Sequence, residues 1–246
     1  MRGLNGKTVL VTGGGGAIGA ALCRRFAQEG ARVLVADRNA DTAQAVAAEV
    51  GGTALVFDIA DHAAAKKAVD SAGQVDVLVN NAGWDRFQNF VETKPEEWDA
   101  LIAINLRGPL NMHHVVLPQM LARGGGRVVN ISSDAARVGS SGEAVYSACK
   151  GGIVSFSKTL AREVARKGVT VNVVCPGPTD TPILRGFAGE GEAGQKVLDA
   201  LVRAIPMKRV GQPDDLPGIV AFLASDDAAY ITGQVISVSG GLTMAG

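Results

Sequence analysis

Three side chains between residues 128 and 152 have the types and the spacing for proton transfer. Tyr146 and Lys150 stand at i and i+4, so on a helix they lie on one face, one turn apart. Ser133 comes earlier, just after the apolar run Val128–Ile131. A phenol has an ordinary pKa of about 10, and a neighbouring ammonium favours the phenolate. The sequence therefore predicts an acid–base group, a charge that tunes it and a hydroxyl that can hold an oxygen atom.

A glycine-rich turn near the N-terminus is the second chemical feature. It follows the predicted strand Thr8–Val11 directly, and Ile18, Leu22 and Phe26 then repeat at i, i+4 and i+8 as one apolar helix face. Glycines at a strand-to-helix turn let the backbone approach a pyrophosphate, which the N–H groups at the helix start can bind. This context predicts phosphate binding rather than a plain tight turn.

The second predicted strand ends at Asp37, where an acid can accept hydrogen bonds from both hydroxyls of a ribose and repel a 2′-phosphate. This favours NAD over NADP as the cofactor, although Arg38 next to it softens the preference. The alternative is that Asp37 or Asn39 caps a helix starting near Ala40. Asp58, after the third strand, lies beside the adenine or in a simple turn.

Composition narrows the possible classes. The chain has 246 residues, 47% of them hydrophobic, and 24 basic residues balance 24 acidic ones. A zero net charge argues against a nucleic-acid or membrane-surface partner, and no apolar run is long enough for a transmembrane helix. The N-terminus has no signal-peptide pattern. Three dispersed cysteines fit a reducing cytoplasm, and the adjacent His113 and His114 do not have metal-ligand spacing, so no metal site is predicted.

Short β-branched runs alternate with helical patterns along most of the chain. Near-continuous apolar runs are typical of parallel strands buried on both faces, and this alternation predicts a doubly wound α/β fold with one domain over residues 1–246. The predicted strands are Thr8–Val11, Arg32–Ala36, Ala54–Phe57, Val75–Val79, Arg127–Ile131, Thr170–Val174 and Gln234–Val238.

Two longer segments lie between these strands. Residues Pro95–Arg123 are predicted to form one long helix, although Asn105 is a poor residue for its middle. Residues Ile183–Pro206 are rich in glycine and charge with weak periodicity, which predicts a mobile substrate lid at about 183–210. Four cations surround it, either to bind phosphates or as ordinary solvated surface: Arg185, Arg203, Lys208 and Arg209.

The sequence offers two features for substrate contact. The cluster Trp84–Phe87 follows a predicted strand, at the end of the sheet where ligands bind, and forms either a pocket wall or a subunit contact. Glu143 precedes the Tyr146 helix. It either faces the pocket mouth and selects against anionic substrates, or it is an acid favoured by the helix dipole.

These motifs together resemble the short-chain dehydrogenase/reductase family over the whole chain. The resemblance is carried by Thr12-Gly13 through Gly19, Asn80-Asn81-Ala82-Gly83, Asn105, Ser133, Tyr146 with Lys150, and Pro176-Gly177. Ala17 departs from the commonest pattern, in which this position is glycine. The family implies a Rossmann fold with a seven-stranded parallel sheet and helices on both faces, and a homotetramer built on two long helices, here Pro95–Arg123 and Ala144–Lys167.

The family also implies residue roles. Tyr146 is expected to be the general acid/base, Lys150 to lower its pKa and bind the nicotinamide ribose, Ser133 to hold the substrate oxygen, and Asn105 to anchor a relay water. The predicted cofactor-binding residues are Gly13, Gly15, Gly16, Ala17, Ile18, Gly19, Asp37, Arg38, Asp58, Ile59, Asn81, Ala82, Gly83, Tyr146, Lys150, Pro176, Gly177, Thr179 and Thr181. The predicted substrate residues are Trp84, Arg86, Ala135, Glu143 and Pro178.

A narrower resemblance is to enzymes that oxidise 2-hydroxycyclohexanecarboxyl-CoA in the breakdown of alicyclic and aromatic acids. It rests on Asn81–Phe87, Asn111–His114, Asp134–Gly139 and Ser237–Met244. It implies an NAD-dependent dehydrogenase of a β-hydroxyacyl-CoA or a related secondary alcohol, with the cationic lid binding coenzyme A phosphates. One alternative is a 3-oxoacyl-acyl-carrier-protein reductase that uses NADPH. The acid at position 37, Asp37, argues against this alternative. Another is an NAD-sensing module without catalysis, which the intact Ser133, Tyr146 and Lys150 disfavour.

Overall fold

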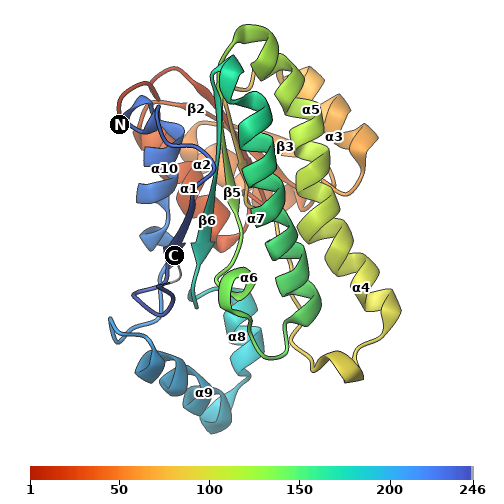
Figure 1. Ribbon diagram of the computed structural model, residues 1–246, viewed down its shortest axis with the longest axis vertical. Helices are drawn as coiled ribbons and strands as arrows, with labels where there is room; N and C mark the ends of the chain where they lie inside the picture. The colour runs from red at the N-terminus through yellow and green to blue at the C-terminus, as the bar shows by residue number, and fades with distance from the viewer. Residues whose placement is uncertain (245–246) are drawn as a thin grey trace.

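The computed structural model describes residues 1–244, and these build one seven-stranded parallel sheet in the order β3-β2-β1-β4-β5-β6-β7 (Figure 1). The order reverses between β1 and β4, so the loops after these two strands diverge and leave a crevice at the carboxyl end of the sheet. The strands are β1 (Thr8–Thr12), β2 (Arg32–Asp37), β3 (Thr53–Val56), β4 (Val77–Asn80), β5 (Gly126–Ile131), β6 (Val169–Pro176) and β7 (Val235–Val238).

Helices cover both faces of the sheet. Figure 1 shows α1 (Ala17–Gln28), α2 (Ala40–Val50) and α10 (Pro217–Ala224) on one face, and α3 (His62–Ala72), α5 (Gly108–Arg123) and α7 (Ala144–Val164) on the other. Two apolar layers result, one around Phe26 and Leu22 and one around Met112 and Met120, all fully buried. Because both faces are covered, every β1 residue is buried, which explains the continuous apolar run in its sequence.

The segment predicted as one helix over Pro95–Arg123 is interrupted. It consists of α4 (Pro95–Ile102), a π-helical turn over Ala103–Arg107, and α5. The turn is centred on Asn105, which is fully buried and whose side-chain amide donates to the Leu101 carbonyl at 3.0 Å. A π turn inside a helix often marks a functional position, since the extra residue redirects a side chain.

The segment Ile183–Pro206, for which the sequence predicts a mobile substrate lid, is helical over most of its length. Two helices occupy it, α8 (Pro182–Ala188) and α9 (Gly191–Ala204), and both lie beyond the carboxyl ends of the strands (Figure 1). Thr181 caps α8 by accepting from the Leu184 N–H, and Pro182 starts the helix where a missing N–H does no harm. We call Pro182–Ala204 the lid.

The short helix α6 (Ala135–Val138) is the remaining α-helix near the strand ends. No helix within residues 1–244 is long and apolar enough to cross a membrane, and this part of the chain has no cluster of three metal-ligating side chains. His113 is buried among polar groups, its ring nitrogen donates to the Pro109 carbonyl at 2.6 Å, and burial lowers its pKa to about 4. It therefore belongs to the core.

Candidate active site

Tyr146 and Lys150 project from the first turns of α7 toward the crevice. The Lys150 ammonium lies 5.6 Å from the centre of the Tyr146 ring and donates to the Ile131 carbonyl at 3.0 Å. In return, the Ser132 hydroxyl donates to the Lys150 carbonyl at 3.0 Å. These two bonds tie α7 to the end of β5, so the lysine has one position relative to the tyrosine.

Ser133 follows β5, and its hydroxyl accepts a hydrogen bond from the Ala135 N–H at 3.1 Å. The next residue, Asp134, is buried and accepts a hydrogen bond from the Ser237 hydroxyl, which itself accepts from Arg137 at 2.8 Å. This network joins α6 to β7 and holds the loop that carries Ser133. The serine therefore stands on a fixed support at the carboxyl end of the sheet.

The electrostatics around Tyr146 differ from the expectation that Lys150 lowers its pKa. Burial is the largest influence and raises the pKa of the Tyr146 phenol, the carboxyl groups of Asp85 and Glu143 raise it further, and only the hydrogen bond with Ser133 lowers it. Burial also lowers the pKa of Lys150 to about 8. Desolvation disfavours the charged forms of both groups.

Asn105 lies behind this group rather than on the cavity wall. Its amide nitrogen donates to the carbonyls of Trp84 (2.7 Å) and Leu101 (3.0 Å), and its oxygen accepts from the Trp84 N–H (3.2 Å). A methyl group on Gly83 would come within 3.1 Å of this oxygen and 3.2 Å of the Lys150 nitrogen, so glycine lets the two approach. Both amide hydrogens of Asn105 are used, so a water can bind this residue only by donating to one of its oxygen atoms.

The glycine turn fits a pyrophosphate. Gly16 is the N-cap residue of α1 and makes no side-chain capping bond, so N–H groups of the first turn face the crevice. Gly13 has φ +63°, and a side chain there would collide with the Ala82 backbone at 2.7 Å. The first turn of a helix with uncapped N–H groups binds anions, and this turn brings its backbone close to the crevice.

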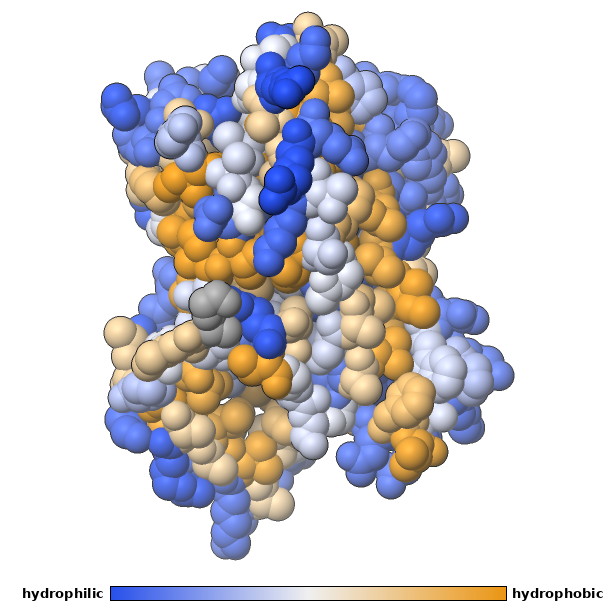
Figure 2. Space-filling view, viewed as in Figure 1, coloured by the Kyte–Doolittle hydropathy of each residue, from blue (hydrophilic) through white to orange (hydrophobic). Residues whose placement is uncertain are grey.

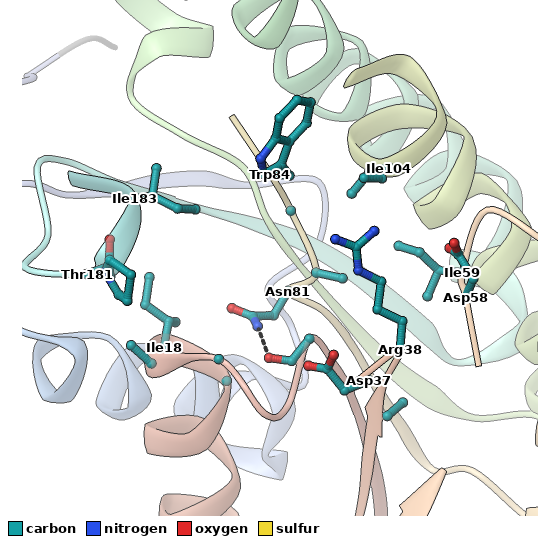
Figure 3. A pocket seen from close by; sticks show the side chains of 18 of the residues that line it. Ile18, Asp37, Arg38, Asp58, Ile59, Asn81, Trp84, Ile104, Thr181 and Ile183 are labelled. Carbon is teal, nitrogen blue, oxygen red and sulfur yellow. Dashed lines mark hydrogen bonds between the residues drawn. The ribbon is translucent and has the colours of Figure 1, made fainter. Parts of the chain in front are cut away.

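Asp37 ends β2 at the same crevice. Its carboxylate accepts from the N–H groups of Gly15 (3.1 Å) and Asn39 (3.0 Å). Asn39, not Asp37, caps α2, since its side chain accepts from the Thr42 N–H. In Figure 3 the Arg38 side chain crosses the cavity toward the side where Ile104 and Trp84 lie. A negative and a positive group thus border the place where a ribose would lie.

The structure gathers most predicted cofactor residues in one cavity of about 360 Å³, the cofactor cleft. Gly15 does not line it, because its N–H is turned to Asp37. The predicted residues that line the cleft are Gly13, Gly16, Ala17, Ile18, Gly19, Asp37, Arg38, Asp58, Ile59, Asn81, Ala82, Gly83 and Thr181.

A second cavity of about 570 Å³ adjoins the cleft and shares Asn81, Trp84 and Thr181 with it. We call it the catalytic cavity. From the predicted sets it contains Ser133, Tyr146, Lys150, Pro176, Gly177, Thr179, Trp84, Ala135, Glu143 and Pro178. Arg86 is the exception among the predicted substrate residues, because it is exposed and pairs with Glu97 at 2.7 Å, away from both cavities.

The apolar half of the catalytic cavity escaped the sequence reasoning. The lid closes on the loop after β4 through Phe187 and Phe87, whose rings are 4.0 Å apart between centres. Other apolar lining residues are Val138, Leu184, Leu201 and Leu242. Figure 2 shows apolar side chains around the hollow between the body and the lid, on the side where α9 lies. The only sequence signal for this wall was Phe87 within the cluster after β4.

Two of the four cations in and next to the lid are paired with carboxylates, which weakens the expected cationic character of this region. Arg185 pairs with Asp180 at 2.8 Å and Arg209 pairs with Asp215 at 2.6 Å. Lys208 donates to the Arg203 carbonyl at 2.8 Å. Carboxylates next to two of the four cations reduce the attraction that coenzyme A phosphates would feel.

A doubly wound sheet with an anion-binding turn at its switch point and a buried Ser–Tyr–Lys group beside it defines a dinucleotide-dependent oxidoreductase. Comparison with known proteins agrees. Residues 15–243 match the family model described as enoyl-(acyl carrier protein) reductase.

Named relatives cover nearly the whole chain. The chain is 38% identical to the 3-oxoacyl-[acyl-carrier-protein] reductase of Escherichia coli, over 97% of this chain and 98% of that protein. It is 40% identical to the acetoacetyl-CoA reductase of Shinella zoogloeoides, over 96% of this chain and 98% of that protein. The crystal structure of a 3-oxoacyl-[acyl-carrier protein] reductase with bound NAD from Brucella melitensis superposes with a TM-score of 0.90 at 30% identity, covering 98% of this chain and 92% of that one.

The chain therefore belongs to the short-chain dehydrogenase/reductase family, as its motifs indicated, and is an oxidoreductase that acts on a CH–OH group or the corresponding ketone with a nicotinamide cofactor.

Proposed function

We propose that the protein is an NAD-dependent dehydrogenase of β-hydroxyacyl-CoA thioesters, with 2-hydroxycyclohexanecarboxyl-CoA or a close cyclic analogue as substrate. The observation that carries this proposal is the catalytic cavity, in which Ser133, Tyr146 and Lys150 face an apolar half closed by Phe87 and Phe187. Such a wall suits a compact hydrocarbon ring next to the reacting carbon. The named relatives act on β-keto thioesters, acetoacetyl-CoA or 3-oxoacyl carrier proteins, which supports the thioester.

The residues present would perform the chemistry as follows. When bound, the oxidised nicotinamide accepts the hydride from the alcohol carbon. Tyr146, as phenolate, takes the hydroxyl proton, so the carbon–oxygen bond becomes a carbonyl while the electron pair leaves with the hydride. Ser133 donates a hydrogen bond to the oxygen throughout, and Lys150 stabilises the phenolate. A positioned general base of this kind contributes about 10²- to 10⁴-fold.

NAD is the proposed cofactor because the Asp37 carboxylate borders the ribose side of the cofactor cleft. The second candidate is a 3-oxoacyl-acyl-carrier-protein reductase with NADPH, which the identity to such reductases favours and Arg38 permits. Asp37 speaks against the phosphorylated cofactor, since two negative groups would meet there.

One set of rate measurements separates these candidates. NAD⁺ and NADP⁺ reduction is followed with CoA thioesters of cyclic and linear β-hydroxy acids, with simple secondary alcohols, and in reverse with 3-oxoacyl thioesters. We expect the highest kcat/KM with NAD⁺ and a cyclic thioester. Preferred turnover of linear 3-oxoacyl thioesters with NADPH would replace this proposal by the second candidate, and NADH binding without any turnover would favour a sensing module.

We propose a homotetramer, as the family resemblance implies, assembled on the segments containing α5 and α7. Light scattering on the purified protein tests this, and a monomer would contradict it.

A further inference from the structure

Two carboxyl groups in the catalytic cavity have no role in the mechanism above. Asp85, in the loop after β4, and Glu143, at the start of α7, both line the cavity together with Tyr146 and Lys150. After burial, these two carboxyl groups are the next influences that raise the pKa of the Tyr146 phenol. Two carboxyl groups in a partly apolar cavity need a counterpart, because charge in a low dielectric is unfavourable.

The carboxyl oxygens of Asp85 have few hydrogen-bond donors around them. One oxygen accepts the Arg86 N–H at 2.7 Å, and the other, Oδ2, is buried without a donor among residues 1–244. The Arg86 guanidinium, which could neutralise it, is bound to Glu97 instead. The Lys150 ammonium also acts on Asp85, and it donates a hydrogen bond to the Ile131 carbonyl at 3.0 Å.

Glu143 does not cap the helix with its side chain. It occupies the N-cap position of α7, and its side chain accepts no capping hydrogen bond, so its carboxyl group is not bound to the backbone of the first turn. Burial raises the pKa of Asp85 to about 8, and the neighbouring Glu143 carboxyl group adds to this rise. Two adjacent carboxyl groups avoid double ionisation by sharing one proton.

We propose that Asp85 and Glu143 form a proton-sharing pair whose single negative charge makes the enzyme reject free β-hydroxy acids and accept only acyl groups whose carboxyl is masked. This inference rests on the proposed function, because it names what distinguishes a thioester from its acid at the same site. The carboxyl carbon of a β-hydroxy acid is two bonds from the carbon that is oxidised. A free carboxylate would therefore lie in the same cavity as the pair. Repulsion between the like charges should lower the affinity for the free acid by between about tenfold and several powers of ten.

The test compares two substrates that differ only in this charge. The first is 2-hydroxycyclohexanecarboxylic acid and the second is its methyl ester, which is neutral and lacks coenzyme A. We expect the wild-type kcat/KM to favour the ester at least about tenfold, and we expect Asp85→Asn/Glu143→Gln to remove most of this ratio by raising turnover of the acid. Glu92→Gln removes an exposed acid outside the cavity and should leave the ratio unchanged. An ester-to-acid ratio that is the same in the double variant and the wild type overturns the proposal.

A second measurement does not depend on activity. Infrared difference spectra at pH 7 should show the carbonyl band of one protonated carboxyl group in the wild type, and Glu143→Gln should shift or remove it. Absence of that band overturns the pair even if no substrate is found. Conversely, failure of the wild type with both the ester and the CoA thioester, with the band present, refutes the proposed function and leaves the pair standing. Where the double variant does not fold, Glu143→Gln alone carries both measurements, since this residue lies at a half-buried helix start.

Discussion

Removing the charge of Asp37 should change the cofactor preference. Asp37→Asn is the suitable substitution, because the carboxylate accepts from the N–H groups of Gly15 and Asn39 and an amide oxygen can keep one of these bonds. A 2′-phosphate next to the carboxylate brings unit charges to about 4 Å, which costs about 4 kcal/mol at an effective dielectric constant of about 20. Asp37 is half-buried at the cleft rim, so salt and solvent reduce this to about 1–2 kcal/mol.

Asp37→Asn should raise kcat/KM with NADP⁺ and lower it with NAD⁺. One to two kcal/mol corresponds to about a 5- to 30-fold rise in kcat/KM with NADP⁺, and the Arg38 guanidinium is then free to bind the added phosphate. With NAD⁺, exchanging a charged for a neutral acceptor at the ribose loses about 1 kcal/mol, or about fivefold. The ratio of the two values should shift by about 25- to 150-fold in favour of NADP⁺.

Steady-state rates with both cofactors and one alcohol substrate measure this ratio. Asp41→Asn is the matched control, because it makes the same change at an exposed acid in the first turn of α2 that does not line the cleft. Asp37→Asn combined with Arg38→Ala should lose most of the gain with NADP⁺. If Asp37→Asn leaves the ratio of kcat/KM with NADP⁺ and NAD⁺ at its wild-type value, the carboxylate does not distinguish the two cofactors and the reasoning is refuted.

Three further outcomes are expected. Tyr146→Phe should lower kcat about 10²- to 10⁴-fold and leave NADH fluorescence titrations unchanged, whereas near-wild-type turnover would remove the phenol from the mechanism. Phe187→Ala loses the contact with Phe87, worth about 0.5–1.5 kcal/mol, so KM for the acyl substrate should rise about 2- to 10-fold, and an unchanged KM would show that the lid does not touch the acyl group. Tyr230→Phe leaves Tyr146 as the single tyrosine, so ultraviolet titration of this variant reports the Tyr146 phenol alone. The pKa should lie above its ordinary value of about 10, because burial and two carboxyl groups favour the neutral form. Adding Glu143→Gln should lower that pKa, and a midpoint below about 10 without it would contradict this account.

The sheet and the glycine turn were predictable because their signals are local. The inner strands β1, β4 and β6 are buried on both faces, so their apolar runs appear in the sequence whatever the neighbours are. The turn after β1 likewise depends on residues close together in the sequence, since a side chain at Gly19 would strike the carbonyl of Gly13 in the same turn. Strand ends differed from the prediction by one to two residues, as with Val77–Asn80 against Val75–Val79.

The lid and the π turn were not predictable, because distant contacts decide them. Glycines at positions 186, 189, 191 and 194 lower the helix propensity of the lid, yet capping by Thr181 and packing of Phe187 on Phe87 still favour helices there. The π turn forms where Asn105 binds the backbone of Trp84, a residue of another loop. Neither contact has a signature in the spacing of residues along the chain.

In the loop after β4, the sequence likewise does not predict the orientation of single side chains. Arg86 and Asp85 are neighbours, and the sequence does not say which of them faces the cavity. The structure turns the arginine outward to Glu97 and leaves the aspartate inside. A cation in the pocket would have suited an anionic substrate, whereas the acid that is there suits a neutral one. If Arg86 faced the cavity instead of Asp85, the inferred charge of the substrate would change. The geometry of the loop, rather than its composition, therefore determines the inferred specificity.

The tyrosine illustrates how an i, i+4 pair on a helix can mislead about a pKa. The spacing of Tyr146 and Lys150 suggests that the ammonium controls the phenol. The same burial that brings them together, however, penalises both charges, lowers the pKa of the lysine and raises that of the tyrosine. Asp85 and Glu143 add to the second effect. A phenol in such a site is a better proton donor for ketone reduction than a base at neutral pH. Oxidation therefore requires a further positive charge beside it, which the oxidised nicotinamide carries when it occupies the adjoining cleft, and binding of that cofactor should couple directly to ionisation of Tyr146.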